Sequence, residues 1–331
     1  MSKIKYSINF VIPSDGKYEN YKSFRGDIDK EWELFNCGEW AWIIQTYHRL
    51  IQCQNSHFTI TKSEKPDINA VNIIFSDDYI KLSNKKNFYC AVIVQDRFVF
   101  YPGDLTIVQN RAHRLFFDYQ YMTLWSQAGL IKKQNKLSSD DKIRIGFFGL
   151  PENSIDLVKI VDEIGHSNLE VAVASQSSWN DYSKIDIAVG IRDFSGKSHI
   201  QKPPTKLLNA WNAGVPFIGG ADSAYSQVGE HLKNYICVTN KDELTSAINF
   251  IVESPRVSTQ LIENGSKEFE KYSNRSLESE WVKLLNSEIV KFKKWKRKPY
   301  FRRYVSNRVR SFFYNYLRVK RRVNMLMGRY K

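Results

Sequence analysis

The sequence predicts an α/β protein with two domains, and three observations lead to this prediction. The chain has 331 residues, 42% of them hydrophobic, so it is long enough for two domains that each bury a core. Short apolar runs alternate with segments whose apolar residues recur at helical spacing, as is typical of strands alternating with helices. The alternation is most regular in the second half, where it predicts a parallel, doubly wound sheet that binds its ligand beyond the carboxyl ends of the strands.

The first half of the chain has clear strands but only one clear helix. Residues 39–52 show helical spacing, with Trp42, Ile43 and Leu50 on the inner face. The expected strands cover residues 7–12, 58–61, 71–75, 89–94 and 105–108. These elements predict a first α/β domain over residues 1–128, and the polar residues 129–141 predict a linker.

The second domain is expected over residues 142–290. Its expected strands cover residues 143–148, 170–174, 185–190, 217–218 and 235–238. Its expected helices cover residues 154–164, 203–213, a short segment from Ser223, residues 242–252 and a helical pattern within 266–290.

Residues 202–231 are the most informative part of the chain. Pro203 and Pro204 suit the first turn of a helix, where a missing N–H costs little, and Gly214 stands where a left-handed residue ends the helix. Lys202 and Lys206 lie at the start of this helix, where the helix dipole disfavours cations. A bound anion resolves the conflict, because helix N-termini bind phosphates through free N–H groups. The alternative is that both lysines point into water.

Arg192 follows the expected strand 185–190, at the edge of the sheet where ligands bind. A guanidinium group can donate to two phosphate oxygens at once. We therefore group Arg192 with Lys202 and Lys206 as a predicted diphosphate site. The alternative is a surface arginine that pairs with Asp193 or with solvent.

This segment resembles the donor-binding half of the bacterial GT-B glycosyltransferases. The residues that carry the resemblance are Lys206, Leu207, Asn209, Ala210, Ala213, Gly214, Pro216 and Ile218, followed by the segment from Gly219 to Glu230. The resemblance extends over roughly residues 141–285. It implies two facing Rossmann-like domains, the first for the acceptor and the second for the diphosphate and ribose of a sugar nucleotide. It also implies that the final helices cross back onto the first domain.

The resemblance assigns roles to three further residues. It implies that Asn209 bonds a ribose hydroxyl, that Tyr225 borders the sugar or the base, and that Glu230 contacts a ribose or sugar hydroxyl. The alternatives are a packing role for Tyr225 and a solvated helix-end position for Glu230. One subgroup of the family has two glutamates separated by seven residues, and those positions are Gln201 and Asn209 here. Whether the transfer retains or inverts the configuration of the anomeric carbon therefore stays open.

An inverting transfer needs a catalytic base from the first domain. Asp27, in the sequence Phe-Arg-Gly-Asp, is the predicted base. Asp15, Glu39 and His113 are alternatives, because they also lie in or beside loops that follow strands. Each of these residue types is also typical of turns and helix caps.

No metal ion or other cofactor is expected. Asp77 and Asp78 are adjacent and therefore do not form a D-x-D motif, the six histidines are dispersed, and the four cysteines form no C-x-x-C pair. The sequence predicts that cationic side chains, in place of a metal ion, neutralise the diphosphate.

Residues 291–331 account for all of the net positive charge of the chain. They hold sixteen Lys or Arg and no Asp or Glu, whereas the whole chain has a formal net charge of +14. Apolar residues recur there at spacings of three and four and predict a basic amphipathic helix: Val305, Val309, Phe312, Tyr316, Val319, Val323 and Leu326. Such helices lie in the headgroup layer of anionic membranes. A partner helix is the second interpretation, and a nucleic acid is the third, because no domain resembles an RNA- or DNA-binding module.

Together these features predict a hexosyltransferase. It would move a sugar from a nucleotide-sugar donor to a hydroxyl of a glycan or lipid-linked acceptor, in surface polysaccharide or glycolipid synthesis. No run of eighteen apolar residues occurs, and the apolar run near the start is too short for a signal peptide. We therefore expect a cytoplasmic protein on the inner face of the cytoplasmic membrane. The alternative function is a non-catalytic scaffold with a degenerate transferase fold.

Overall fold

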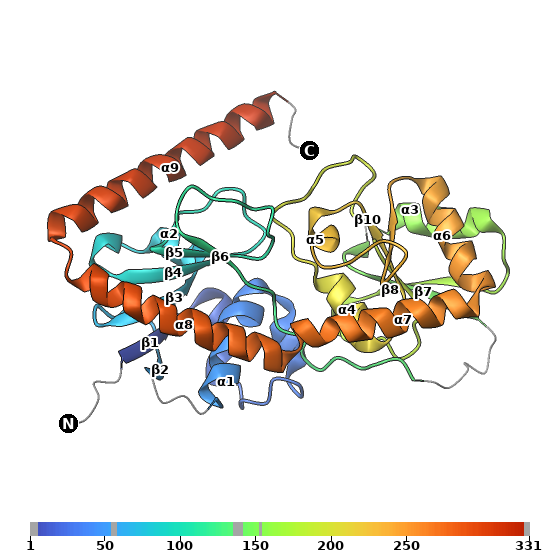
Figure 1. Ribbon diagram of the computed structural model, residues 1–331, viewed down its shortest axis with the longest axis horizontal. Coiled ribbons are helices and arrows are strands. Elements are labelled where there is room, and N and C mark those ends of the chain that lie inside the picture. Colours follow the sequence, from blue (N-terminus) through green and yellow to red (C-terminus); the bar gives the residue numbers. More distant parts are fainter. Residues whose placement is uncertain (1–5, 54–57, 135–141, 152–153, 328–331) are drawn as a thin grey trace.

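The computed structural model describes residues 6–53, 58–134, 142–151 and 154–327. The chain forms two α/β domains that lie side by side, each built on its own parallel sheet (Figure 1). Two long helices near the C-terminus follow the second domain and lie against the first. The predicted α/β class is confirmed.

The first domain contains six parallel strands in the order β2-β1-β3-β4-β5-β6. Their bounds are Tyr6–Val11 (β1), Phe58–Ser63 (β2), Ala70–Phe75 (β3), Tyr89–Val94 (β4), Leu105–Val108 (β5) and Tyr119–Tyr121 (β6). β3 and β4 are buried along their whole length, which explains why both read as continuous apolar runs. All five predicted strands are present, whereas β6 is short and largely exposed and was missed.

The helices of the first domain are short. The predicted helix 39–52 is a π-helical turn at Trp40–Ile44 followed by α1 (Gln45–Ile51), and α2 covers Ser76–Lys81. Short 3₁₀ turns lie at Gly16–Lys22, Trp32–Asn36 and Lys85–Asn87.

The second domain contains five parallel strands in the order β11-β10-β9-β7-β8. Their bounds are Ile143–Phe148 (β7), Leu169–Ala174 (β8), Ile187–Gly190 (β9), Phe217–Gly220 (β10) and Ile236–Val238 (β11). The chain passes from β7 to β8 on one side and later to β9 on the other. The strand order therefore reverses at β7, and ligands of open α/β sheets bind at such a point.

The helices of the second domain agree with the prediction, apart from one that was missed. They are α3 (Ile155–Ile164), α4 (Thr205–Ala213), α5 (Ser223–Ser226), α6 (Lys241–Glu253) and α7 (Pro255–Phe269), of which α7 was not predicted. Gly214 ends α4 with φ 72°, as expected of a left-handed cap. The predicted linker is described only for residues 129–134, and the remaining residues 135–141 lie outside the described residues.

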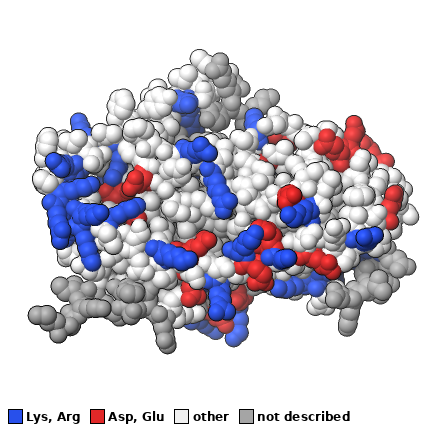
Figure 2. Space-filling model, in the orientation of Figure 1, with Lys and Arg blue, Asp and Glu red and all other residues white. Residues whose placement is uncertain are grey.

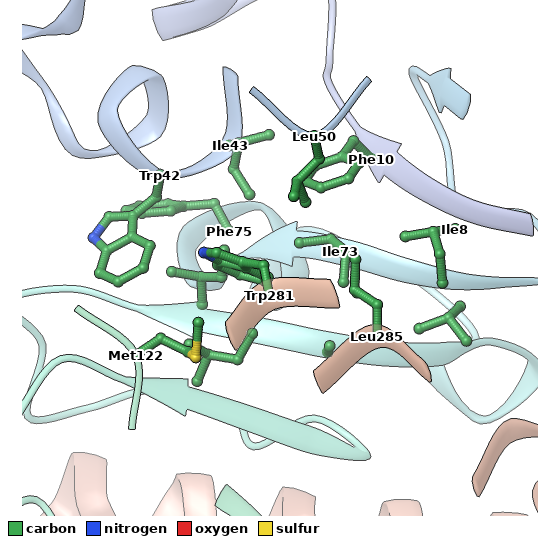
Figure 3. Close-up of a cluster of buried hydrophobic side chains, with 14 of the residues drawn as sticks. Ile8, Phe10, Trp42, Ile43, Leu50, Ile73, Phe75, Met122, Trp281 and Leu285 are labelled. Carbon is green, nitrogen blue, oxygen red and sulfur yellow. The ribbon is translucent and has the colours of Figure 1, made fainter. Parts of the chain in front are cut away.

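Helix α8 (Asn274–Lys296) crosses from the second domain to the first and completes the core there (Figure 1). Trp281 and Leu285 are fully buried among Phe10, Trp42 and Ile73, which belong to the first domain (Figure 3). Side chains further along α8 are also buried against this core, so the helix extends past residue 290, where the tail was predicted to begin.

The loop after β5 links the two domains by hydrogen bonds. Gln109 Nε2 donates to the carbonyl oxygen of Gln201 at 2.9 Å, and Asn110 Nδ2 donates to that of Lys202 at 3.0 Å. Asn110 Nδ2 also donates to Ser223 Oγ at 2.9 Å. The segment that precedes α4 and the first residue of α5 are thereby held against the first domain.

The C-terminal helix α9 (Tyr300–Leu326) is present and docks on the first domain. Tyr101 Oη donates to the carbonyl oxygen of Asn307 at 2.9 Å, and Arg310 Nη2 lies 2.9 Å from Asp104 Oδ1. The opposite side of α9 is exposed to solvent. None of the helices in the described ranges combines the length and the apolar character needed to cross a bilayer.

Candidate functional site

A cleft of about 590 Å³ lies between the two domains. The residues after β7 and β9 line it from the second domain, together with the first turn of α4. The residues after β4 and the segment from Phe35 to Ala41 line it from the first domain. The cleft therefore lies at the point where the second sheet reverses its strand order, as the topology rule requires.

Lys206 lies in the first turn of α4 and lines the cleft. Its Nζ lies 4.4 Å from the ring centroid of Phe147, and a Cβ added at Gly149 would lie 3.0 Å from it. No carboxylate of the described residues forms an ion pair with Lys206. Burial and the neighbouring Arg192 lower the pKa of Lys206 to about 8. An anion in the cleft would relieve this unfavourable position.

Arg192 follows β9 and also lines the cleft. Its Nε donates to Asp222 Oδ2 at 2.7 Å, and the Asp222 side chain is 4% exposed. Arg192 is thus held by Asp222, not by Asp193, the alternative considered from the sequence. One nitrogen of the guanidinium group binds this carboxylate, and the planar group has further N–H donors for a ligand.

Lys202 lines the cleft and forms an ion pair across it. Its Nζ lies 3.2 Å from Oδ1 of Asp96, in the loop after β4. Asp96 has φ 52°, which is uncommon for a residue other than glycine. It is the one carboxylate among the described residues that line the cleft. The sequence analysis missed Asp96, although its place directly after a buried strand was an available signal.

Asn209 is the remaining predicted residue that the structure brings into the cleft. Its Oδ1 accepts from the backbone N–H of Gln127 at 3.4 Å. Arg192, Lys202, Lys206 and Asn209 therefore come together as expected.

Tyr225 and Glu230 do not lie in the cleft. Tyr225 is 0% exposed and packs edge-on against Phe217 beneath the cleft, so it belongs to the core, as the packing alternative held. Glu230 is exposed, and its Oε2 accepts from Lys233 Nζ at 2.7 Å. Sequence position alone did not reveal that these two side chains point elsewhere.

Asp27 also lies outside the cleft. Its side chain is 46% exposed, and it accepts from the backbone N–H of Lys30 at 3.1 Å and pairs with the Lys30 ammonium group. It is a turn residue, and the structure does not bring it to the cleft. The alternatives Asp15, Glu39 and His113 do not line the cleft either. Glu39 is buried and pairs with Lys17 at 2.9 Å.

Within the described part of the chain, no group of three or more His, Cys, Asp or Glu side chains is arranged to hold a metal ion. The absence of a metal requirement stays a prediction.

No protein-family model and no curated protein matches this sequence. Among solved structures, the chain is similar to Anabaena HepE in complex with UDP and glucose, with a TM-score of 0.51 and 10% identity over 85% of this chain and 100% of HepE. It is also similar to S. aureus TarM, with a TM-score of 0.50 and 14% identity over 67% of this chain. The chain spans 56% of the length of TarM. These similarities confirm the two-domain GT-B fold.

Proposed function

We propose that this protein is a glycosyltransferase that transfers a sugar from a nucleotide-sugar donor to a hydroxyl group of a glycan or lipid-linked acceptor, without a metal ion. The observation that carries the proposal is the convergence of Lys206, Lys202 and Arg192 at the carboxyl ends of β7 and β9. The GT-B fold supports it, and so does the UDP and glucose bound by HepE.

The second domain would hold the leaving diphosphate. When the bond between the anomeric carbon and the diphosphate oxygen breaks, negative charge develops on that oxygen. Lys206, Lys202 and Arg192 would stabilise this charge, together with the first N–H groups of α4, which no side chain caps. Asn209 would bond a ribose hydroxyl, as the family resemblance implies.

The first domain would bind the acceptor and provide the catalytic base. We propose Asp96 for this role in place of Asp27, because Asp96 faces the cleft from the acceptor side. Its carboxylate would take the proton of the acceptor hydroxyl as the acceptor oxygen bonds to the anomeric carbon. A base in this position suits an inverting transfer, and the anomeric configuration of the product tests that assignment.

Residues 291–331 would bind the enzyme to the inner face of the cytoplasmic membrane through α9. The exposed side of this helix carries an apolar stripe that includes Phe312, 76% exposed, and Val319, 60% exposed. Arg302 and Lys320 flank the stripe on one side and Arg308 and Arg322 on the other, as in helices that lie at anionic membrane surfaces. A full-length Phe312→Asp/Val319→Asp variant should no longer float with anionic vesicles. Unchanged flotation would contradict the proposal.

Nucleotide binding tests the donor site and separates it from the scaffold alternative. UDP, GDP and dTDP should be screened for an increase in melting temperature, followed by hydrolysis assays with the corresponding nucleotide sugars. At least one nucleotide should stabilise the protein, and Lys206→Ala should abolish that effect. If no nucleotide acts and Lys206→Ala changes nothing, the scaffold interpretation stands.

A further inference from the structure

Asp222 is a buried carboxylate beside the cationic cleft. On the face of the molecule in Figure 2, Asp and Glu side chains lie at the surface among Lys and Arg, where water and salt screen their charges. Asp222 differs from them, because its side chain is buried behind the cleft and does not line it. Charge alone makes this position unfavourable for an anion site, since a carboxylate repels a phosphate. The presence of Asp222 therefore needs another explanation.

The place of Asp222 at a helix start does not explain it. Asp222 is the N-cap residue of α5, where an aspartate side chain commonly accepts from the N–H of the second or third helical residue. Here the side chain makes no capping bond. Its Oδ2 accepts instead from Arg192 Nε at 2.7 Å, and its Oδ1 lies 3.9 Å from His199 Nε2. Both partners line the cleft, so the carboxylate is directed away from its helix and towards the donor site.

The bond to Asp222 fixes the direction of the Arg192 guanidinium group. Because this group is planar, a hydrogen bond at Nε sets where Nη1 and Nη2 point. Neither Nη group forms a hydrogen bond or ion pair with any residue that the structure describes. Both are therefore left for a ligand, and a guanidinium group can donate to two phosphate oxygens at once.

The backbone that carries the carboxylate is also held in place. The carbonyl oxygen of Asp222 accepts from the backbone N–H of Tyr225 at 3.1 Å. The backbone N–H of Ser223 donates to the carbonyl oxygen of Ser198 at 3.0 Å, and Ser223 Oγ accepts from Asn110 of the first domain. The carboxylate thus has a fixed position before a nucleotide binds.

Asp222 also acts on the charge of Lys206. Burial and the positive charge of Arg192 lower the pKa of Lys206 to about 8, and Lys202 adds to this effect. The negative charge of Asp222 acts in the opposite direction and raises the pKa of Lys206. Without this carboxylate, more of the lysine would be neutral in the free protein.

We infer that Asp222 is a positioning residue of the donor site, which holds the Arg192 guanidinium group so that both Nη groups can donate to the diphosphate. The inference rests on the proposed function and adds to it a residue that does not touch the donor. It also predicts a sign. Loss of the carboxylate should weaken the binding of a nucleoside diphosphate, whereas Coulomb repulsion alone predicts that binding becomes tighter.

Calorimetric titration with whichever of UDP, GDP and dTDP stabilises the wild type tests this sign, at about pH 7, where most of Lys206 is charged. Asp222→Ala should weaken binding by about tenfold or more, as expected for the loss of one charge-assisted hydrogen bond. Asp222→Asn keeps an acceptor oxygen for Arg192 and should recover part of this loss. Asp193→Asn is the matched control, because Asp193 Oδ2 lies 3.4 Å from His199 Nε2 but forms no ion pair with Arg192. The control should bind the nucleotide at least as tightly as the wild type.

A double-mutant cycle separates positioning from a general loss of structure. If Asp222 acts through Arg192, Arg192→Met/Asp222→Ala should bind the nucleotide no more weakly than Arg192→Met alone. If Asp222→Ala lowers the melting temperature, Asp222→Asn, which keeps the shape of the side chain, replaces it in the cycle. At about pH 8, Asp222→Asn should also take up more protons on binding than the wild type does, because the pKa of Lys206 falls.

Two kinds of result would overturn the inference and leave the proposed function intact. One is that the Asp222 variants bind the nucleotide as tightly as the wild type or more tightly. The other is that the losses from Arg192→Met and from the Asp222 variant add in the double variant. A wild type that binds none of the three nucleotides would instead overturn the proposed function, and the inference with it.

Discussion

Binding of a nucleoside diphosphate should be accompanied by proton uptake at Lys206. In the free protein, burial and Arg192 lower the pKa of this lysine to about 8. A diphosphate beside Nζ would raise the pKa again, because an opposite charge favours the ammonium form. At pH 8 about half of the free molecules hold a neutral lysine, so binding should take up about half a proton. The uptake should be about one tenth of a proton at pH 7 and about nine tenths at pH 9.

Calorimetric titration with the nucleotide that stabilises the protein measures this uptake. The titration is repeated at pH 8 in buffers of different ionisation enthalpy, and the slope of the observed enthalpy gives the number of protons. Lys206→Met should abolish the uptake while keeping the aliphatic stem against Phe147. Lys159→Met, an exposed change on α3, should leave the uptake unchanged. An unchanged slope in Lys206→Met would refute the assignment of the diphosphate to Lys206.

The same lysine has an effect on stability without ligand. Its pKa is lower in the folded protein than the ordinary value of 10.5, so the unfolded chain binds more protons between about pH 8 and pH 10.5. Over that window this group should make the free protein more stable as the pH rises. Lys206→Met should remove this part of the pH dependence in urea unfolding experiments.

Three further predictions concern other parts of the molecule. Asp96→Asn should lower the rate of sugar transfer by about a hundredfold or more without weakening nucleotide binding, whereas Asp27→Asn, at an exposed residue, should leave the rate unchanged. Equal rates in the wild type and both variants would exclude Asp96 as the base. Arg310→Met should lower the free energy of unfolding by about 3 kcal/mol in urea titrations, because it leaves the Asp104 carboxylate buried without its cation, and Arg310→Met/Asp104→Asn should recover part of the loss. Gly214→Ala should lower the free energy of unfolding by about 1 kcal/mol, because alanine disfavours the left-handed φ of 72°. Steric clash adds nothing, since an added Cβ meets no atom within 4 Å. An unchanged midpoint of urea unfolding would contradict this prediction.

The parts of the fold that could be predicted are those in which local pattern and tertiary role coincide. β3 and β4 are apolar because they are buried on both faces, and α4 ends at Gly214 because the chain needs a left-handed residue there. β6 could not be predicted, because its three residues are ordered by pairing with β5 and not by their own burial. Phe292 and Trp295 resemble tail residues in sequence, yet they pack on Tyr89 of β4, a contact made by the crossing of α8.

The candidate site was predicted where it derives from one contiguous segment. Lys202, Lys206 and Asn209 lie on or beside α4, so their proximity could be predicted from the sequence alone. Asp96 is 106 residues from Lys202, and only the packing of the two domains brings their side chains to 3.2 Å. Tyr225 lies in the segment that follows the family pattern, yet its side chain is buried in the core and does not reach the cleft.

If the protein is the transferase proposed above, the crossing of α8 has a consequence for its rate of turnover. Because α8 belongs to the core of the first domain and α7 to that of the second, a rotation of one domain against the other would turn about residues 270–273 between them. Such a rotation would break polar contacts, such as Asn110 with Ser223 and Lys202 with Asp96, and would leave both apolar cores intact. Release of the nucleoside diphosphate product would then depend on hydrogen bonds and ion pairs with which water and salt compete. Added salt should therefore speed the release of this product, even though it weakens binding of the nucleotide-sugar donor.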